Sequence, residues 1–469
     1  MEGSNEGRVE VYRTLTVKTV KHQDPLYSKL DILSLNAKRL YNKLLFSCRQ
    51  TLFIEKQLIT SYYTLERLAK AEYSSLYKSL PAQTSQQLIR LLSSNLKSFK
   101  ALDDKYNAYL CGQHSKIQRP RLPNYYKSKG RAPVCFTNQQ VSNRNLDKGF
   151  IKFPQSTGIE PIKFNKPKYL SKYYLQELRI IPKNQCYKIE LVFRGSEEIP
   201  EKGSGRSYAS IDLGLGNLVT IAYFKEGRRY IPKTISGRGL KSYNNYFNEK
   251  LSNLSKCLSG LNKGKESEHG KQGTSLAINQ LYNKRSRVFN TFYHEVSTYI
   301  VNDLKSKEIT DLIIGYNKGW KNGVHRNKRL SRSISRDFVQ IGYSKLLHLL
   351  QYKCSLAGIS VHLQCESYTS CTSFLDRQYP CKENYDRSIR VCRGCIKTST
   401  NKQINADVNA AYQILVRYLA TENRREHHID YTQDTTDYYA QFSHLLESPI
   451  SWFVPVTVDL KKFSINKRS

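Results

Sequence analysis

The sequence predicts a multidomain protein that combines α+β and α/β parts, and three observations lead to this fold class. The chain has 469 residues, more than one ordinary domain holds. Apolar residues recur at helical spacing over residues 25–110, whereas residues 134–195 offer short runs typical of antiparallel strands. After a polar linker at 197–207, strand and helix patterns alternate, which is typical of an α/β domain.

The elements follow from periodicity and from proline positions. Residues 8–20 alternate apolar and polar side chains and predict a strand, and the prolines of 118–133 predict a basic loop. The turn residues of 134–195 leave a small antiparallel barrel and a small antiparallel sheet as alternatives. Beyond the linker the patterns predict, in chain order, a hairpin at 208–224, helices over 240–307, a strand at 311–317, a helix at 333–358, a strand at 359–366 and a helix at 405–420.

The composition points to a polyanionic partner. Lys and Arg total 75 and Asp and Glu total 39, which gives a formal net charge of +36. Such a surplus repels itself in a compact fold, and nucleic acid would neutralise it. No apolar run reaches the length of a membrane span, and the N-terminus lacks the pattern of a secretory signal. We therefore expect no membrane partner and a cytoplasmic protein that associates with the nucleoid when it is bound to DNA.

Three carboxylates stand at positions where a metal site is plausible. Asp212 lies inside an apolar strand, where an ionised carboxylate needs a salt bridge, hydrogen bonds or a metal ion to compensate it. Glu366 ends a predicted strand, and Asp407 opens a predicted helix. Together they have the chemistry to hold two Mg²⁺ ions, as phosphodiester cleavage requires. The alternatives are a solvated strand end for Glu366 and a helix cap for Asp407.

The eleven cysteines are an odd number and widely scattered, so a disulfide framework is not expected. Cys392 and Cys395 form a CxxC pair, and Cys371 and Cys381 lie upstream of it. Four thiolates can close a tetrahedral Zn²⁺ site. The alternative is a reduced loop without metal.

Two basic segments are candidates for nucleic-acid binding, because Arg and Lys contact phosphates and Tyr can stack on bases. The alternatives are a solvated face for the charges and core packing for Trp320. The candidates in the first segment are Arg119, Arg121, Tyr125, Tyr126, Lys127 and Lys129, and those in the second are Lys318, Trp320, Lys321, Arg326, Lys328, Arg329, Arg332 and Arg336.

Four ordered motifs resemble a known family. SIDLGLGNLVTIA, DLIIGYNKGWK, ESYTSCTSFLD and INADVNAAYQIL resemble, in this order, the RuvC-like nuclease of the TnpB family, the transposon-encoded RNA-guided endonucleases related to compact type V CRISPR effectors. The resemblance implies an RNase H-type fold with Asp212 on the first strand and Asp407 at the last helix. It also implies a domain order: a β-barrel-like wedge domain at 1–24 and 118–200, a helical recognition domain at 25–117, a RuvC-like nuclease domain at 208–367 and 401–420, a zinc-finger-like insertion that binds target nucleic acid at 368–400, and a C-terminal extension of unknown role at 421–469.

The chain departs from the family at one position. In most of the family the second catalytic carboxylate is a Glu on the strand that reads LIIGYN here, and Gly315 stands in its place. Members with GYNKGWK resemble a rearranged subgroup in which a Glu before Tyr-Thr-Ser takes over, which here is Glu366. Glu383 and Glu308 are the alternatives.

The resemblance implies an RNA-guided DNA endonuclease with a guide RNA and double-stranded target DNA as partners. Mg²⁺ would be held by Asp212, Glu366 and Asp407, and Zn²⁺ is the second expected metal. If no Glu replaces the missing one, the chain resembles nuclease-inactive relatives that repress transcription by RNA-guided binding. A general RNA-binding protein has no use for these acidic motifs. Monomer and dimer both remain open.

Overall fold

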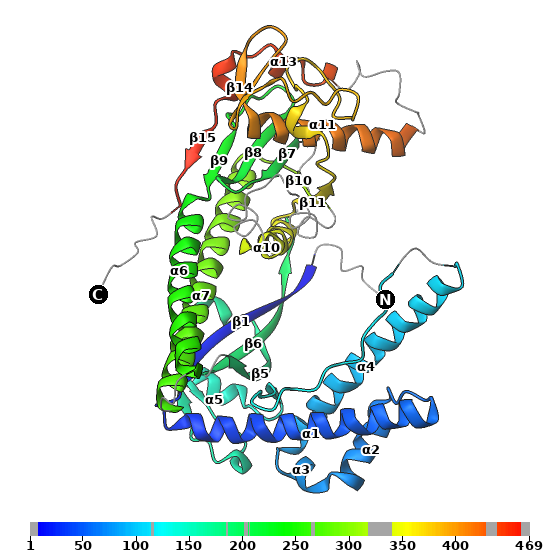
Figure 1. The fold of residues 1–469 in the computed structure, drawn as a ribbon, viewed down its shortest axis with the longest axis vertical. Helices are drawn as coiled ribbons and strands as arrows, with labels where there is room; N and C mark the ends of the chain where they lie inside the picture. Colours follow the sequence, from blue (N-terminus) through cyan, green and yellow to red (C-terminus); the bar gives the residue numbers. More distant parts are fainter. Residues whose placement is uncertain are drawn as a thin grey trace. The chain divides into compact units, whose positions relative to one another are not determined.

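The computed structural model describes residues 8–113, 117–183, 186–200, 205, 207–263, 268–317, 340–427 and 439–460, with backbone only at 261–263, 268–274 and 423–427. The chain separates into two compact units, one of residues 10–197 and the other of residues 198 onward with the start of the first strand. Both contain helices and sheets (Figure 1), so the predicted multidomain α+β fold class is confirmed. No helix in the described part of the chain is long and apolar enough to cross a membrane.

The unit of residues 10–197 contains a helical block and a four-stranded sheet. Its helices are α1 (Leu26–Glu55), α2 (Tyr62–Glu72), α3 (Ser74–Lys78), α4 (Ala82–Leu110) and α5 (Asn143–Asp147). The strand order of the sheet is β1 (Arg8–Lys21), β6 (Cys186–Glu198), β5 (Tyr174–Lys183) and β2 (Val134–Thr137). Smaller elements are β3 (Phe150–Ile151), η1 (Gln155–Thr157), β4 (Ile162–Lys163) and η2 (Lys168–Leu170). Closure of this sheet into a barrel stays a prediction.

The prolines and the apolar spacing explain the local structure of this unit. Residues 117–133 contain neither helix nor strand, as the prolines predict. The buried side chains of α1 recur three or four residues apart and form the stripe that packs on its neighbours. They include Leu30, Leu33, Ala37, Leu40 and Leu44.

The second unit is built on a six-stranded sheet. Its strand order is β11 (Ser360–Gln364), β10 (Asp311–Gly315), β7 (Ser207–Leu213), β8 (Asn217–Lys225), β9 (Lys233–Ser236) and β15 (Val456–Val458). β7, β8 and β9 pair antiparallel, whereas β10 runs parallel to both β7 and β11. Asp212 lies on the first strand of this sheet and Asp407 on helix α11 (Ala406–His427), where the resemblance places them for an RNase H-type domain.

Helices cover both faces of this sheet, and the alternation of β7 decides what faces each side. Ala209, Ile211 and Leu213 enter the core formed with α6 (Arg238–Lys263), α7 (Glu268–Ser306) and α10 (Tyr343–Leu356). Tyr208 enters the core on the opposite face, formed with α11. Asp212 differs from Tyr208 by an even number of residues, so it shares the α11 face.

The segment between β11 and α11 and the C-terminal segment complete the α11 face. The first contains η3 (Thr369–Cys371) and a small sheet of β12 (Arg390–Cys392), β13 (Cys395–Lys397) and β14 (Gln403–Asn405). The second contains α13 (Ser443–Leu446) and η4 (Ile450–Phe453) and ends in β15, which pairs parallel with β9. Tyr439, Phe442, Leu445 and Phe453 are buried in the α11 core. The described part of the C-terminal extension is therefore structural.

Candidate functional site

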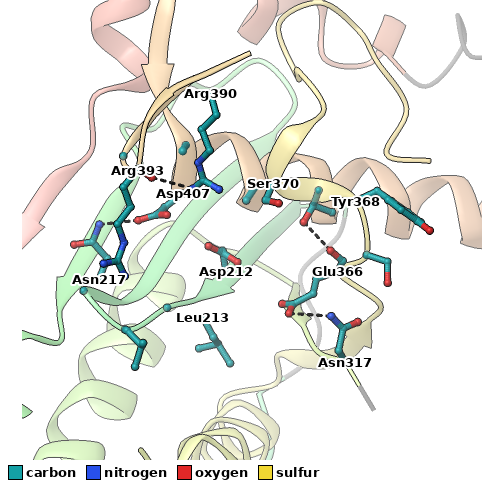
Figure 2. A pocket seen from close by; sticks show the side chains of 18 of the residues that line it. Asp212, Leu213, Asn217, Asn317, Glu366, Tyr368, Ser370, Arg390, Arg393 and Asp407 are labelled. Carbon is teal, nitrogen blue, oxygen red and sulfur yellow. Dashed lines mark hydrogen bonds between the residues drawn. The ribbon is translucent and has the colours of Figure 1, made fainter. Parts of the chain in front are cut away.

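The parallel strands of the six-stranded sheet bring Asp212, Glu366 and Asp407 to one pocket. β7 and β11 lie on either side of β10 and run in the same direction, so their carboxyl ends meet at one edge of the sheet. Asp212 is the penultimate residue of β7, and Glu366 follows β11 by two residues. Asp407 lies in the first turn of α11. All three line a cavity of about 910 Å³ (Figure 2).

Asp212 sits where its own charge is unfavourable. Burial raises the pKa of the Asp212 carboxyl well above its usual value, and the neighbouring carboxylates of Glu366 and Asp407 raise it further. Arg390 acts in the opposite direction and lowers the pKa. The pocket therefore concentrates negative charge at Asp212 beyond what Arg390 compensates, and a cation bound there would relieve the repulsion.

Glu366 is held at the end of β11 by a neighbour and by the space that Gly315 leaves. The side-chain amide of Asn317 donates to Oε1 of Glu366 over 3.1 Å. A Cβ atom at Gly315 would lie 3.0 Å from Oε2 of Glu366 and 2.6 Å from Cδ1 of Ile414. The Glu366 carboxylate thus lies against the position where the resemblance implies a Glu in most of the family.

Asp407 is fixed by contacts that use the other polar residues of the motifs. Nδ2 of Asn217, at the start of β8, donates to Oδ2 of Asp407 over 2.8 Å. The side-chain oxygen of Asn405 accepts hydrogen bonds from the backbone N–H groups of Asp407 and Val408 at 2.9 and 3.0 Å and so caps α11. A Cβ atom at Gly214 would lie 2.6 Å from the carbonyl oxygen of Asn217, so the turn needs this glycine.

Four arginines line the same pocket, and the sequence analysis did not single them out. Three of them, Arg387, Arg390 and Arg393, come from the segment between β11 and α11, and Arg238 begins α6. Arg390 also donates to the backbone carbonyl of Arg393 over 2.9 Å. Three arginines within seven residues beside a CxxC pair are a visible signal, but the pattern does not reveal that this loop folds back over the carboxylates.

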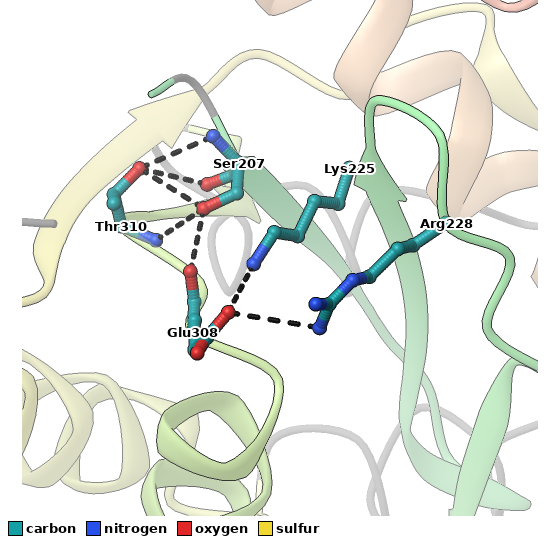
Figure 3. Close-up of polar contacts among 5 residues, drawn as sticks. All are labelled: Ser207, Lys225, Arg228, Glu308 and Thr310. Atoms are coloured by element: carbon teal, nitrogen blue, oxygen red, sulfur yellow. Dashed lines mark hydrogen bonds and ion pairs between the residues drawn. The ribbon is translucent and has the colours of Figure 1, made fainter. Parts of the chain in front are cut away.

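The two alternative glutamates do not join this pocket. Glu308 lies beside the start of β7, where its backbone carbonyl accepts a hydrogen bond from the Ser207 hydroxyl (Figure 3). Asp212 lies at the opposite end of that strand. Its carboxylate pairs with Lys225 at 2.5 Å and with Arg228 at 3.7 Å. Glu383 is exposed and is not among the residues that line the cavity. Of the glutamates considered, the fold brings Glu366 to Asp212 and Asp407.

The described residues contain no group of three or more His, Cys, Asp or Glu side chains arranged to hold a metal ion. The three carboxylates therefore share a pocket without converging on a single point. Mg²⁺ is normally bound through one or two carboxylates together with water and substrate phosphates, rather than in a cage made only of protein. Hard carboxylate oxygens in a pocket that raises the pKa of Asp212 fit such an ion.

The four cysteines expected to bind zinc are not gathered in one group among the described residues. Cys371 is buried in η3, whereas Cys392 is exposed on β12. Cys392 and Cys395 are paired across β12 and β13, as a CxxC turn requires. Since no three ligands gather among the described residues, Zn²⁺ stays a prediction without support from side-chain placement.

Of the two basic segments, only the first lies among the described residues. The second, from Lys318 to Arg336, lies outside the described residues. In the first, Tyr125 is exposed with the guanidinium of Arg49 4.4 Å from its ring centre, whereas Tyr126 packs edge-on against Tyr41 at 5.0 Å. Exposed charges surround them at Arg119, Arg121, Lys127 and Lys129. Tyr126 thus serves packing, and nucleic-acid binding by Tyr125 and the charged residues of this segment stays a prediction.

Family comparisons agree with the motifs. Residues 185–321 match the model of the OrfB_IS605 family, described as a probable transposase. This part of the chain is similar to the TnpB family. Residues 343–414 match the Cas12f1-like TNB domain, and that match includes Glu366, the three pocket arginines of the loop and Asp407. The predicted family resemblance is confirmed, while no curated protein matches the chain.

Solved structures of compact effectors are similar over most of the chain. A Cas12f1–sgRNA–target DNA complex shares 16% identity, with a TM-score of 0.46 and coverage of 82% of this chain and 81% of that one. CasPhi-2 (Cas12j) bound to crRNA shares 9% identity, with a TM-score of 0.41 and coverage of 87% and 98%. The mini-RNA-guided endonuclease CRISPR-Cas_phi3 shares 12% identity, with a TM-score of 0.39 and coverage of 87% and 92%.

Proposed function

We propose that this chain is an RNA-guided DNA endonuclease of the TnpB family, and that it cleaves DNA in the pocket of Asp212, Glu366 and Asp407. One observation carries the proposal: three carboxylates from separate elements line one pocket, and two of them raise the pKa of the third. A protein that only bound nucleic acid would gain nothing from concentrating negative charge where a phosphate must approach.

The cofactor that fits this donor set is Mg²⁺. When bound, Mg²⁺ supplies an activated water and stabilises the leaving oxygen of a phosphodiester. Glu366 would act in place of the Glu that the family carries at position 315, which is supported by the 3.0 Å approach between its Oε2 and a Cβ atom built there. Asn217 and Asn317 orient Asp407 and Glu366, so that their oxygens are positioned before substrate arrives.

The loop arginines supply the opposite charge that a phosphate needs. Arg387, Arg390 and Arg393 line the pocket with the carboxylates. Guanidinium groups bind phosphate oxygens in a bidentate manner, and here they would hold the DNA backbone against the metal site. The same arginines would lower the cost of bringing a polyanion close to three carboxylates.

A guide RNA and a double-stranded DNA target are the proposed partners. The net charge of +36 requires a large polyanion, and base pairing by a bound RNA would supply sequence specificity. We assign the helical block of α1–α4 to recognition of the guide–target duplex, the four-stranded sheet to a wedge, the six-stranded sheet to the RuvC-like nuclease, and residues 368–400 to binding of target nucleic acid.

The test begins with the RNA. The chain is expressed with its flanking genomic DNA, the RNA that co-purifies is sequenced, and a DNA target matching its variable end is offered with Mg²⁺. Glu366→Gln and Asp407→Asn keep side-chain shape and remove charge, so each is expected to lower the cleavage rate at least roughly 100-fold, which corresponds to about 2.7 kcal/mol of transition-state stabilisation. Binding of RNA and target is expected to stay unchanged.

Glu308→Gln is the matched control, because Glu308 lies beside the start of β7, away from the pocket, and its side chain is 68% exposed. It is expected to cleave like the wild type. Cleavage that persists in Asp407→Asn contradicts the site assignment. If the wild type does not cleave while its RNA complex still binds target, the protein is instead an RNA-guided binding protein.

A further inference from the structure

A second chemical surface adjoins the carboxylates in the same pocket. Tyr368, Tyr385 and Arg387 line the cavity together with Glu366, and none of the three aromatic or guanidinium groups is needed to hold a metal. The rings of Tyr368 and Tyr385 meet edge to face, with centres 5.7 Å apart and planes at 71°. The guanidinium of Arg387 lies 5.9 Å from the ring centre of Tyr385. These three side chains form a contiguous group at the pocket.

Tyr368 is the more exposed of the two tyrosines in this group. It is 39% exposed, and Figure 2 places it beyond Glu366, on the side away from Asp212. An aromatic ring that is exposed to a polar cavity is available for stacking with a planar ligand. Glu366, two residues earlier in the chain, belongs to the proposed metal site and lines the same pocket, so a ligand on Tyr368 would lie on the Glu366 side of that site.

The backbone of Tyr368 is in a left-handed conformation, with φ of 69° and ψ of 0°. Bulky side chains rarely adopt this conformation, and where they do the surroundings must impose it. Here the hydroxyl of Thr369 donates to the carbonyl of Glu366 at 2.9 Å, that of Thr372 to the carbonyl of Tyr368 at 3.0 Å, and Arg417 to the carbonyl of Ser367 at 2.6 Å. The turn that carries Glu366 and Tyr368 is therefore fixed from several sides.

We propose that Tyr368 and Tyr385, with Arg387 behind them, form a nucleobase-stacking site that holds one unpaired base next to the phosphate in the carboxylate pocket. This inference rests on the proposed nuclease function. Aromatic rings stack on any base and discriminate little between sequences, whereas a base inside a duplex has both faces covered. The site thus takes an unpaired strand, and stacking sets the register in which the strand lies across the metal site.

The first experiment measures stacking without cleavage. The Glu366→Gln protein, carrying its co-purified RNA, is titrated with single-stranded DNA in which 2-aminopurine occupies one position after another. Stacking on tyrosine quenches 2-aminopurine fluorescence, so strong quenching is expected at one position, and Tyr368→Leu is expected to abolish it. Leu keeps a Cβ atom and therefore the same backbone strain. The two proteins then differ in the presence of the aromatic ring at position 368.

The second experiment measures the consequence for cleavage in the otherwise wild-type complex. Tyr368→Leu is expected to raise KM about 5-fold to 100-fold, the range for loss of one base–aromatic stack, with a small change in kcat, while Tyr368→Phe stays near wild type. On a strand that lacks the base at the quenched position, the wild type and Tyr368→Leu are expected to be equal. Tyr282→Leu, at a tyrosine 43% exposed on α7 and outside the pocket, is the control and should change nothing.

The outcomes separate this inference from the proposed function. Equal quenching in Tyr368→Leu and its parent, or a Tyr368→Leu defect that persists on the abasic strand, overturns the stacking site even if cleavage is robust. Position-specific quenching that depends on Tyr368 supports it even if the wild type does not cleave. A melting temperature equal to that of the parent protein excludes unfolding as the cause.

Discussion

Asp212 lies on the six-stranded sheet and faces α11, whereas Asp303 lies on α7, which covers the other face of the same sheet. The charges that surround the two carboxylates have opposite signs. Asp303, on α7, accepts hydrogen bonds from Tyr223 at 2.6 Å and from Lys233 at 2.6 Å, and it pairs with Lys307 one helical turn away. Burial alone would raise the pKa of Asp303, but the hydrogen bonds from these partners outweigh burial and lower the pKa. Asp212 faces two more carboxylates, and its pKa is raised.

The difference separates a structural carboxylate from one that awaits a cation. A fold that needs a buried acid only for stability surrounds it with donors, as at Asp303. A fold that clusters three acids accepts a destabilising interaction, which is reasonable where a ligand repays it. From its sequence Asp303 is one acid on an amphipathic helix, so local pattern does not distinguish the two environments.

Removing Asp303 should produce the largest change in stability. Asp303→Asn leaves Lys233 and Lys307 without their anion in a mostly buried site, and about 3 kcal/mol of unfolding free energy is expected to be lost. Chemical denaturation measures it. The loss should shrink as pH falls through the lowered pKa of Asp303, because the wild-type carboxyl then also becomes neutral. An unchanged midpoint at pH 7 would refute the structural role.

Filling the space at Gly315 should have an intermediate effect on the carboxylate side. In Gly315→Ala the new Cβ atom meets Ile414 and Glu366, so roughly 2 kcal/mol of stability is expected to be lost and cleavage to fall as Glu366 is displaced. A sharper test moves the carboxylate from position 366 to position 315. Gly315→Glu combined with Glu366→Gly should cleave at least about 10-fold faster than Glu366→Gly alone. Equal rates, in two variants with equal melting temperatures, would mean that the two positions do not share one site.

Neutralising Asp212 should have the smallest effect on stability, and the opposite sign. Asp212→Asn removes a repulsive charge, so the metal-free protein is expected to gain on the order of 1 kcal/mol at pH 7. The raised pKa means that Asp212 alone costs no stability below its usual pKa of 3.8, and that its cost appears as pH rises through the folded pKa. The gain in unfolding free energy of Asp212→Asn over the wild type should therefore vanish near pH 4 and increase as the pH rises. A constant advantage across this range would contradict the electrostatic account.

The strands, the main helices and the three carboxylates could be predicted, because periodicity and ordered motifs are local. The predicted strand at 311–317 is β10, Asp311–Gly315, and the predicted helix at 405–420 is the start of α11. The prediction for Glu366 needs one correction. β11 ends at Gln364, so Glu366 lies in the strained turn after the strand rather than at its end.

Contacts between distant segments could not be predicted. Arg390 lies 178 residues after Asp212, and no local pattern says that its loop returns to β7. The C-terminal segment shows no clear periodicity, yet Phe442 and Phe453 fill the core under α11 and β15 extends the sheet. Sequence spacing predicted zinc from four cysteines, but spacing does not establish that the sulfurs converge.

Asp212, Glu366 and Asp407 are proposed to form a cation site. The most direct measurement is an electron paramagnetic resonance titration of Mn²⁺ in the RNA complex with an uncleavable phosphorothioate target strand. Wild type, Glu308→Gln and Asp407→Asn carry the same RNA, so metal bound to RNA cancels in the differences. One or two more tightly bound Mn²⁺ ions are expected in wild type and Glu308→Gln than in Asp407→Asn. Equal binding in all three proteins would contradict it.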